Sequence, residues 1–293
     1  MKTPVPLTIG EMRRWLGREL RGVGIEEAAL EADLLLEHFL ARGRAELVLS
    51  YQEPLSPQLA ETIQAAAKRR QQREPLAHIL GEWEFRGLPF AVSEAVLIPR
   101  PETELLVDLA LAPANMPDHG WQHILDLGTG SGILAISLAL ACPAASVTAV
   151  DRSAAALTVA RANARRHRVA ERVNMLQSDW LAALAPGEFF DLVVANPPYV
   201  ASGELAGLQP EVARFEPRLA LDGGPDGLDQ IRRLAGELPA VMKQAALLLM
   251  EIGWDQKEAV LALFSASTAY ERVAVKNDLA GRPRILMAWR TRS

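Results

Sequence analysis

Apolar side chains recur three and four positions apart through residues 8–73, which places them on one face of successive helices. Thr8, with Glu11 three positions later, has the form of a capping box, and Ser56 followed by Pro57 is typical of a second helix start. The pattern therefore predicts a small helical domain. Its apolar positions are Met12, Trp15, Leu16, Ala32, Leu35, Leu36, Phe39, Leu40, Leu59, Ile63 and Ala66.

The pattern changes over residues 75–92, where apolar side chains are separated by polar ones around the turn signal Arg86-Gly87. This alternation predicts a pair of strands that connects the helical domain to the rest of the chain. The apolar positions of the pair are Trp83, Phe85, Phe90 and Val92.

From His123 onward, short apolar runs alternate with amphipathic stretches of helical length. Strands that alternate with helices in this way predict an α/β fold, a parallel sheet covered on both faces. We place the domain boundaries at residues 1–73, 74–95 and 96–293. The expected strands are residues 124–127, 147–150, 173–177, 192–195, 246–252, 273–275 and 285–289, and the expected helices include 133–141 and 154–166.

Composition narrows the class of protein. With 49% hydrophobic and 23% charged residues the chain is expected to fold, and its net charge of -5 disfavours a protein that coats nucleic acid. Cys142 is the single cysteine, so no intramolecular disulfide is expected, and the five histidines and Cys142 lack metal-ligand spacing. Residues 1–10 lack the apolar core of a signal peptide, and no apolar run approaches the roughly 20 residues of a membrane span. We expect a cytoplasmic protein without a metal site.

A glycine-rich turn follows the first strand of the predicted sheet. Asp126 ends the strand, and the glycines let the backbone turn sharply and approach a ligand without a Cβ in the way. Ligands of open α/β sheets bind at this edge. An ordinary turn between a strand and a helix is the structural alternative, which the number of glycines disfavours. The candidate binding residues are Gly128, Thr129, Gly130, Ser131 and Gly132.

The next two strands indicate which ligand the turn serves. Asp151 follows the second strand, where an acidic side chain can accept hydrogen bonds from both hydroxyls of a ribose. Asp179 and Trp180 follow the third strand, where an aromatic ring can flank an adenine. No Gly-Lys-Ser/Thr follows the glycines, which excludes a Walker loop. The spacing predicts a site for a nucleoside.

The fourth strand runs directly into Asn196, Pro197, Pro198 and Tyr199. Two prolines supply no N–H to a sheet, so the chain must leave it abruptly beside the nucleoside site. The Asn196 side-chain oxygen and the Pro197 carbonyl can each accept one N–H of a planar NH2 group, while Tyr199 packs against its flat face. These four residues are the candidate catalytic and substrate-binding residues. The structural alternative is a loop whose prolines merely end a strand.

The whole chain resembles the bacterial release-factor glutamine methyltransferases, the PrmC/HemK family. The motifs that carry the resemblance are residues 97–104 (Leu-Ile-Pro-Arg-Pro-Glu-Thr-Glu), 126–132, 151, 179–180, 196–199, 214–217 (Arg-Phe-Glu-Pro) and 251–253 (Glu-Ile-Gly).

The resemblance implies an N-terminal helical domain that recognises the substrate, a β hairpin, and a class I methyltransferase domain with a Rossmann-like seven-stranded sheet whose last strand is antiparallel. It implies S-adenosylmethionine as cofactor, held by Gly128 to Gly132, Asp151, Trp180 and Asn196. The implied substrate is the glutamine of the Gly-Gly-Gln motif in class 1 peptide release factors. We expect a monomer with no membrane and no nucleic-acid substrate. The resemblance assigns no roles to Arg100, Glu102 or Glu104.

Three alternatives stay open at this point. The Asn-Pro-Pro-Tyr motif is shared with N6-adenine methyltransferases of DNA and RNA, and ribosomal-protein glutamine methyltransferases have similar chemistry but lack the Arg-Pro-x-Thr-Glu segment. A binding module that has lost activity is disfavoured by the intact Asn196 and Asp151. The basic residues that would serve a nucleic-acid substrate are Lys68, Arg69, Arg70, Arg73, Arg161, Arg165, Arg166 and Arg168.

Overall fold

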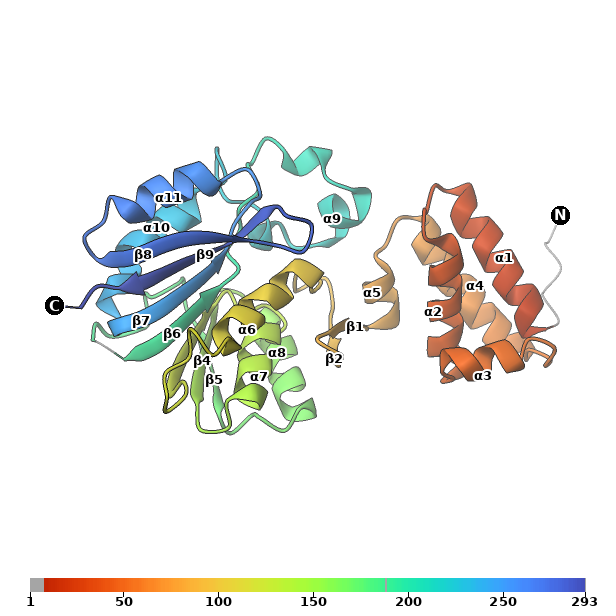
Figure 1. Cartoon of the computed structure of the whole chain (residues 1–293). Coiled ribbons are helices and arrows are strands. Elements are labelled where there is room, and N and C mark those ends of the chain that lie inside the picture. Colours follow the sequence, from red (N-terminus) through yellow and green to blue (C-terminus); the bar gives the residue numbers. More distant parts are fainter. Residues whose placement is uncertain (1–7, 188, 293) are drawn as a thin grey trace. The chain divides into compact units, whose positions relative to one another are not determined.

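The computed structural model describes residues 8–187 and 189–292. The chain divides into two compact units. The first comprises the chain up to Gly81 together with Pro210–Phe215, and the second comprises Glu82–Gln209 and the chain from Glu216 onward. Figure 1 shows the elements of both units.

The first unit is helical, as the sequence predicts. Thr8 accepts a hydrogen bond from the Glu11 backbone while the Glu11 carboxylate accepts one from Thr8, so the capping box is confirmed. Ser56 caps the helix that begins at Pro57. The helices are α1 (Ile9–Gly22), α2 (Ala28–Leu40), α3 (Arg44–Leu49), α4 (Pro57–Gln71), α5 (Leu76–Leu80) and α9 (Pro210–Phe215).

Helix α9 belongs to this unit although it lies far along the chain. The buried Arg70 donates hydrogen bonds to Glu31 at 2.7 Å and to Glu211 of α9 at 2.8 Å, and Arg73 donates to Glu211 at 2.9 Å. Because a buried guanidinium needs carboxylate partners, these ion pairs tie α9 to α2 and α4. They also lower the pKa of the Glu211 carboxylate, against the opposing effect of its burial.

The expectation for residues 75–92 is wrong over its first part, because Leu76–Leu80 form α5. Pro75 precedes this helix, and Gly81 ends it with a φ of 75°, a left-handed conformation that suits glycine. The hairpin itself, β1 (Glu82–Phe85) and β2 (Leu88–Ala91), is confirmed. Its turn residues Arg86 and Gly87 both have positive φ, which matches the right-handed twist of the two strands.

The second unit contains a seven-stranded sheet of order β5-β4-β3-β6-β7-β9-β8. The first five strands of that order are parallel, and β9 runs antiparallel to both of its neighbours. The α/β prediction with an antiparallel last strand is confirmed. The strands are β3 (His123–Leu127), β4 (Ser146–Asp151), β5 (Val173–Gln177), β6 (Phe190–Ala195), β7 (Met242–Glu251), β8 (Tyr270–Asn277) and β9 (Pro283–Arg290).

Helices cover both faces of this sheet (Figure 1). Successive residues of β3 point to opposite faces, so Ile124 belongs to one hydrophobic core and Leu125 to the other. The first core includes side chains of α6 (Glu104–Leu111), α7 (Ile133–Ala141) and α8 (Ala154–Arg166), and the second includes side chains of α10 (Asp229–Glu237) and α11 (Lys257–Ser265). Short 3-10 helices are Pro101–Thr103, Leu205–Gly207, Arg218–Ala220 and Leu238–Ala240.

Among the described residues, none of the helices is both long enough and apolar enough to span a membrane.

Gly132 provides a test of how the glycine turn is packed. Its φ is 86°, and an added Cβ would lie 3.0 Å from Ile136 Cδ1 and 3.3 Å from Ala160 Cβ. We expect Gly132→Ala to lower the free energy of unfolding by roughly 1 to 3 kcal/mol, because it adds backbone strain and overpacks α7 against α8. Urea unfolding followed by tryptophan fluorescence measures this. The control is Gly236→Ala in α10, where a Cβ meets nothing within 4 Å and the change should stay below about 1 kcal/mol. Equal effects of the two substitutions would contradict the packing argument.

Candidate functional site

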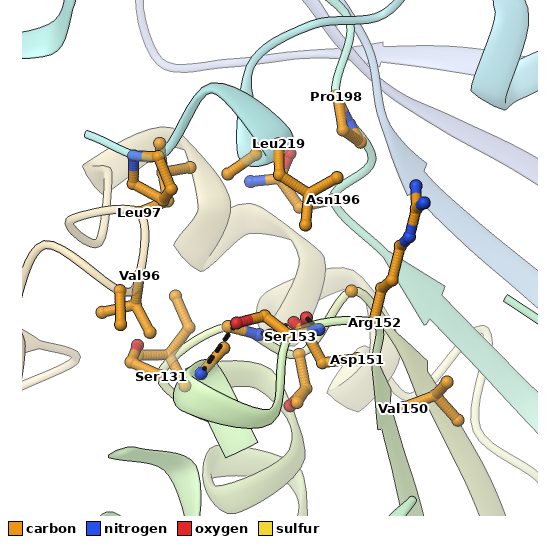
Figure 2. Close-up of a pocket in the computed structure, with 18 of the residues that line it drawn as sticks. Val96, Leu97, Ser131, Val150, Asp151, Arg152, Ser153, Asn196, Pro198 and Leu219 are labelled. Atoms are coloured by element: carbon orange, nitrogen blue, oxygen red, sulfur yellow. Dashed lines mark hydrogen bonds between the residues drawn. The ribbon is translucent and has the colours of Figure 1, made fainter. Parts of the chain in front are cut away.

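A cavity of about 510 Å³ opens at the carboxyl edge of the sheet, and all of its lining residues belong to the second unit. Figure 2 shows Asn196, Pro198 and Leu219 on one side of the cavity and Ser131 and Asp151 on the other. Eight of the residues predicted from the sequence line it, namely Gly128, Thr129, Gly130, Ser131, Asp151, Trp180, Asn196 and Pro198. Gly132, Pro197 and Tyr199 are described by the structure but are not among the lining residues.

The glycine turn has the left-handed backbone that its sequence requires. Gly128 has a φ of 74° and Gly130 a φ of 55°. A Cβ on Gly128 would lie 3.5 Å from the Trp180 ring, so the indole packs directly across the turn. The Trp180 Nε1 donates a hydrogen bond to Gln230 Oε1 at 2.8 Å, which holds the ring in this position. Trp180 thus presents an aromatic face beside the glycines.

A buried asparagine, which the sequence reasoning missed, supports the same turn. Asn163 of α8 is fully buried and donates hydrogen bonds to the carbonyls of Ser131 at 2.8 Å and of Ala91 at 3.0 Å. Its side-chain oxygen accepts a bond from the Ala91 backbone at 2.8 Å. One side chain therefore links the hairpin to the glycine turn. A polar residue on the apolar face of a predicted helix was the available signal.

Asp151 lies at the end of β4 with its carboxylate directed at the glycine turn. One oxygen accepts a hydrogen bond from the Gly130 backbone at 2.9 Å, and the other accepts one from the Ser153 backbone at 2.8 Å. Each carboxylate oxygen can accept a second hydrogen bond. The group is therefore fixed in place and still able to bind the two hydroxyls of a diol.

Asp126 is a fully buried carboxylate beneath the turn. One of its oxygens accepts hydrogen bonds from the Thr129 hydroxyl at 2.6 Å and from the Ala135 backbone at 3.1 Å. The other oxygen, Oδ1, is buried without a hydrogen-bond partner among the described residues. Burial raises the pKa of Asp126 to about 7, although the two hydrogen bonds favour the charged form; the nearby Asp151 raises it further.

The turn after β6 places Asn196 at the cavity and Pro197 in the protein interior. The Asn196 amide nitrogen donates a hydrogen bond to Thr103 Oγ1 at 3.2 Å. Tyr199 is not a lining residue, and its hydroxyl donates to Glu251 Oε1 at 3.1 Å. Burial, and then the charge of Glu251, raise the pKa of Tyr199, so its hydroxyl keeps its proton.

A glycine-rich loop that the sequence reasoning missed braces this turn. Backbone bonds join Val200 N to the Leu221 carbonyl at 3.0 Å and Gly223 N to the Val200 carbonyl at 2.8 Å. A Cβ on Gly227 would lie 2.3 Å from the Tyr199 carbonyl oxygen, and Gln256 Nε2 donates to that oxygen at 3.0 Å. The run Gly-Gly-Pro-Asp-Gly at residues 223–227 was the signal that could have found it.

The structure also places the segment to which no role was assigned. Arg100 lines the cavity and is ion-paired with the buried Glu216, which also accepts a hydrogen bond from Ile98 N at 3.2 Å. Glu102 and Glu104 do not line the cavity. The Glu104 carboxylate instead accepts a hydrogen bond from the Arg86 backbone in the hairpin turn, at 2.8 Å.

Several of the basic residues considered for nucleic acid have carboxylate partners. Arg69 pairs with Glu74, and Arg166 pairs with Glu82 at 2.9 Å, in addition to the pairs of Arg70 and Arg73 described above. Within residues 8–187 and 189–292, no group of three or more His, Cys, Asp or Glu side chains is arranged to hold a metal ion.

The order of the sheet, its antiparallel last strand and the cavity at the carboxyl edge define the class I methyltransferase fold. Family models agree with this class: the PrmC N-terminal domain matches residues 11–81, and the methyltransferase small domain matches residues 103–210.

Curated relatives identify the family within this class. The chain is 46% identical over 256 residues to the release factor glutamine methyltransferase of Bordetella pertussis, covering 87% of this chain and 93% of that protein. It is 44% identical over 269 residues to the corresponding protein of Cereibacter sphaeroides, covering 92% of this chain and 94% of that protein. The chain belongs to the release factor glutamine methyltransferase family.

Solved structures support the fold alone. The hMettl16 catalytic domain, solved in complex with the MAT2A 3′UTR hairpin 6, aligns with a TM-score of 0.53 at 14% identity over 81% of this chain and 83% of that one. A methyltransferase from Pyrococcus furiosus aligns with a TM-score of 0.52 at 15% identity over 71% of this chain and 91% of that one.

The burial of Asp126 predicts a pH-dependent stability. Because burial raises its pKa from the ordinary value of 3.8 to about 7 in the folded protein, the carboxyl binds a proton there that the unfolded chain has already lost. Its contribution to stability therefore falls as the pH rises from about 4 to 7 and is constant above that. The side chain in Asp126→Asn cannot ionise, so this variant does not lose stability between about pH 4 and 7 through this position. We expect the stability of the Asn variant relative to the wild type to increase by roughly 2 to 3 kcal/mol between pH 5 and pH 8.

Urea unfolding of both proteins at the two pH values measures this change. A stability difference that does not vary with pH would show that Asp126 is ionised throughout.

Proposed function

We propose that this chain transfers a methyl group from S-adenosylmethionine to the side-chain amide nitrogen of the glutamine in the Gly-Gly-Gln loop of class 1 peptide release factors, and thereby modulates translation termination. Membership of the release factor glutamine methyltransferase family supports this substrate. One observation carries the chemistry: Asn196 lies at the cavity, and its amide nitrogen is engaged by Thr103, so its oxygen is left as an acceptor.

The lining of the cavity fits S-adenosylmethionine, which supplies an activated methyl group on a positively charged sulfur when bound. Asp151 retains acceptor capacity for the two ribose hydroxyls. The Trp180 ring offers a flat apolar wall for an adenine. We assign cofactor binding to Gly128, Thr129, Gly130, Ser131, Asp151, Trp180 and Asn196, with Gly132 shaping the end of the turn.

The residues after β6 orient the nitrogen that receives the methyl group. An amide nitrogen is a poor nucleophile because its lone pair is delocalised into the carbonyl, so two acceptors must hold its NH2 group in one direction. We assign these roles to the Asn196 side-chain oxygen and the Pro197 carbonyl. Pro198 lines the cavity beside them, and Tyr199 anchors the turn through Glu251.

We assign recognition of the release factor to the helical domain. The cavity is lined by the second unit alone, which leaves the first unit available for contacts to a protein substrate. The first unit extends to Gly81, and the PrmC N-terminal domain model ends at residue 81. The cytoplasmic location and the monomeric state expected from the sequence remain parts of this proposal.

Replacing Asp151 tests the cofactor site. We expect Asp151→Ala to weaken S-adenosylmethionine binding by roughly 2 to 4 kcal/mol, because it removes a charged acceptor that serves two hydroxyls. Isothermal titration calorimetry measures this affinity. Asp118→Ala, which removes an exposed carboxylate outside the cavity lining, is the matched control and should bind like the wild type. An unchanged dissociation constant for Asp151→Ala would place the ribose ligand elsewhere.

Transfer of labelled methyl groups tests the substrate. We expect incorporation into a class 1 release factor, and none into its variant with Gln→Ala in the Gly-Gly-Gln loop, into ribosomal proteins, or into adenine-containing DNA or RNA. Asn196→Ala should nearly abolish turnover and leave the fold intact, because positioning of the nitrogen is worth several kcal/mol of the barrier.

Each alternative has its own outcome in this experiment. Preferential labelling of nucleic acid would show that the chain is an adenine methyltransferase. Labelling of a ribosomal protein would show that its substrate is a glutamine of that protein. Undiminished labelling of the Gln→Ala loop variant would exclude the glutamine amide nitrogen of the release factor as the methylated atom.

A further inference from the structure

Three hydrogen bonds run through buried groups beneath the turn after β6. Asn196 Nδ2 donates to Thr103 Oγ1 at 3.2 Å, Thr103 Oγ1 donates to Glu251 Oε2 at 2.7 Å, and Tyr199 donates to Glu251 Oε1 at 3.1 Å. Thr103 and Glu251 are each 1% exposed, so water does not replace these partners. The three elements involved are the 3-10 helix before α6, the end of β7 and the turn after β6.

Sheet register explains why these groups meet. Ala195, the last residue of β6, pairs with Met250 of β7, so the residues that follow, Asn196 and Glu251, reach the same edge side by side. Thr103 lies between them at the start of α6.

The chain of bonds has a fixed direction because a hydroxyl carries a single hydrogen. An ionised Glu251 can only accept, so Thr103 must give its hydrogen to that carboxylate. Thr103 Oγ1 can then only accept from Asn196, which must turn its NH2 group toward Thr103. The amide oxygen of Asn196 is left for the cavity.

We propose that Thr103 and Glu251 are positioning residues that hold the Asn196 side-chain oxygen toward the substrate. This inference rests on the proposed function, because it concerns the acceptor for the substrate NH2 group. In the opposite orientation, the Asn196 NH2 group would face the substrate NH2 group, donor against donor, and the reacting nitrogen would lose a partner.

The surroundings of Glu251 fit this role. Burial raises the pKa of Glu251, while the hydrogen bond from Thr103, the positive charge of Arg284 and the hydrogen bond from Tyr199 favour the charged form; Glu102 opposes them. Each carboxylate oxygen lies within hydrogen-bond distance of one hydroxyl, so an ionised Glu251 accepts from both Thr103 and Tyr199.

Near-isosteric substitutions that remove the hydrogen bonds of Thr103 and Glu251 test the inference. We expect Thr103→Val and Glu251→Met each to lower kcat for methyl transfer to release factor by roughly tenfold to a hundredfold. In both variants the Asn196 amide can rotate and exchange the positions of its oxygen and its NH2 group. The dissociation constant for S-adenosylmethionine should stay within about twofold of the wild type. Thr103→Ser, which keeps the hydroxyl, should restore most of kcat.

A second measurement follows the amide itself and needs no substrate. In protein labelled with [15N]asparagine, the side-chain NH2 signal of Asn196 is assigned by its loss in Asn196→Ala. We expect slow hydrogen exchange of this group in the wild type and in Thr103→Ser, and faster exchange in Thr103→Val and Glu251→Met. Tyr199→Phe is the matched control, since it removes a bond to Glu251 but leaves the bond between Thr103 and Asn196.

The two measurements separate the inference from the proposed function. Wild-type kcat and unchanged amide exchange in Thr103→Val and Glu251→Met would overturn the positioning role, as would a Thr103→Ser variant as impaired as Thr103→Val. If the wild type transfers no methyl to release factor while the amide exchange responds as expected, the proposed substrate is wrong and the orientation of Asn196 stands.

Discussion

The site depends on the point where strand β6 can no longer continue. Pro197 and Pro198 have no N–H to offer a neighbouring strand, so the chain turns out of the sheet immediately after Ala195. The two prolines alone would not fix the position of the residues that follow them. Instead, Val200 is bonded to the segment around Asp222, and Gln256 holds the Tyr199 carbonyl. Asn196 therefore lies between two fixed segments of backbone, strand β6 before it and the anchored residues Tyr199 and Val200 after it.

Three buried carboxylates each accept a hydrogen bond from a residue that lines the cavity, and their other partners differ. Glu216 accepts from a guanidinium and a backbone N–H, and Glu251 accepts from two hydroxyls. One oxygen of Asp126 accepts two hydrogen bonds, and the other has no hydrogen-bond partner among the described residues. Burying a carboxylate costs free energy, and a hydrophobic side chain would stabilise the fold as well or better. Such groups are characteristic of sites that hold charge or direct hydrogen bonds, and here each of them holds a side chain that lines the cavity.

The architecture can be predicted from the amino-acid sequence alone. Apolar spacing predicts the helical domain, and the bounds expected for α7, α8 and β5 agree with the structure, because local periodicity records which face of each element is buried. It failed at Leu76–Leu80, where a short apolar run fits a strand as well as a helix. The glycine turn, Asp151 and Asn196 were also readable, since motifs at the ends of successive parallel strands must meet at one edge.

The contacts that hold these residues in place cannot be predicted from local sequence patterns, because they join distant parts of the chain. Thr103 and Glu251 are 148 positions apart, and Asn163 lies 32 positions from Ser131, so no local pattern relates them. The assignment of α9 to the helical unit rests in the same way on ion pairs between Glu211 and residues more than a hundred positions earlier. Side-chain hydrogen bonds depend on register and packing in three dimensions, whereas the sequence records only which residues are available to make them.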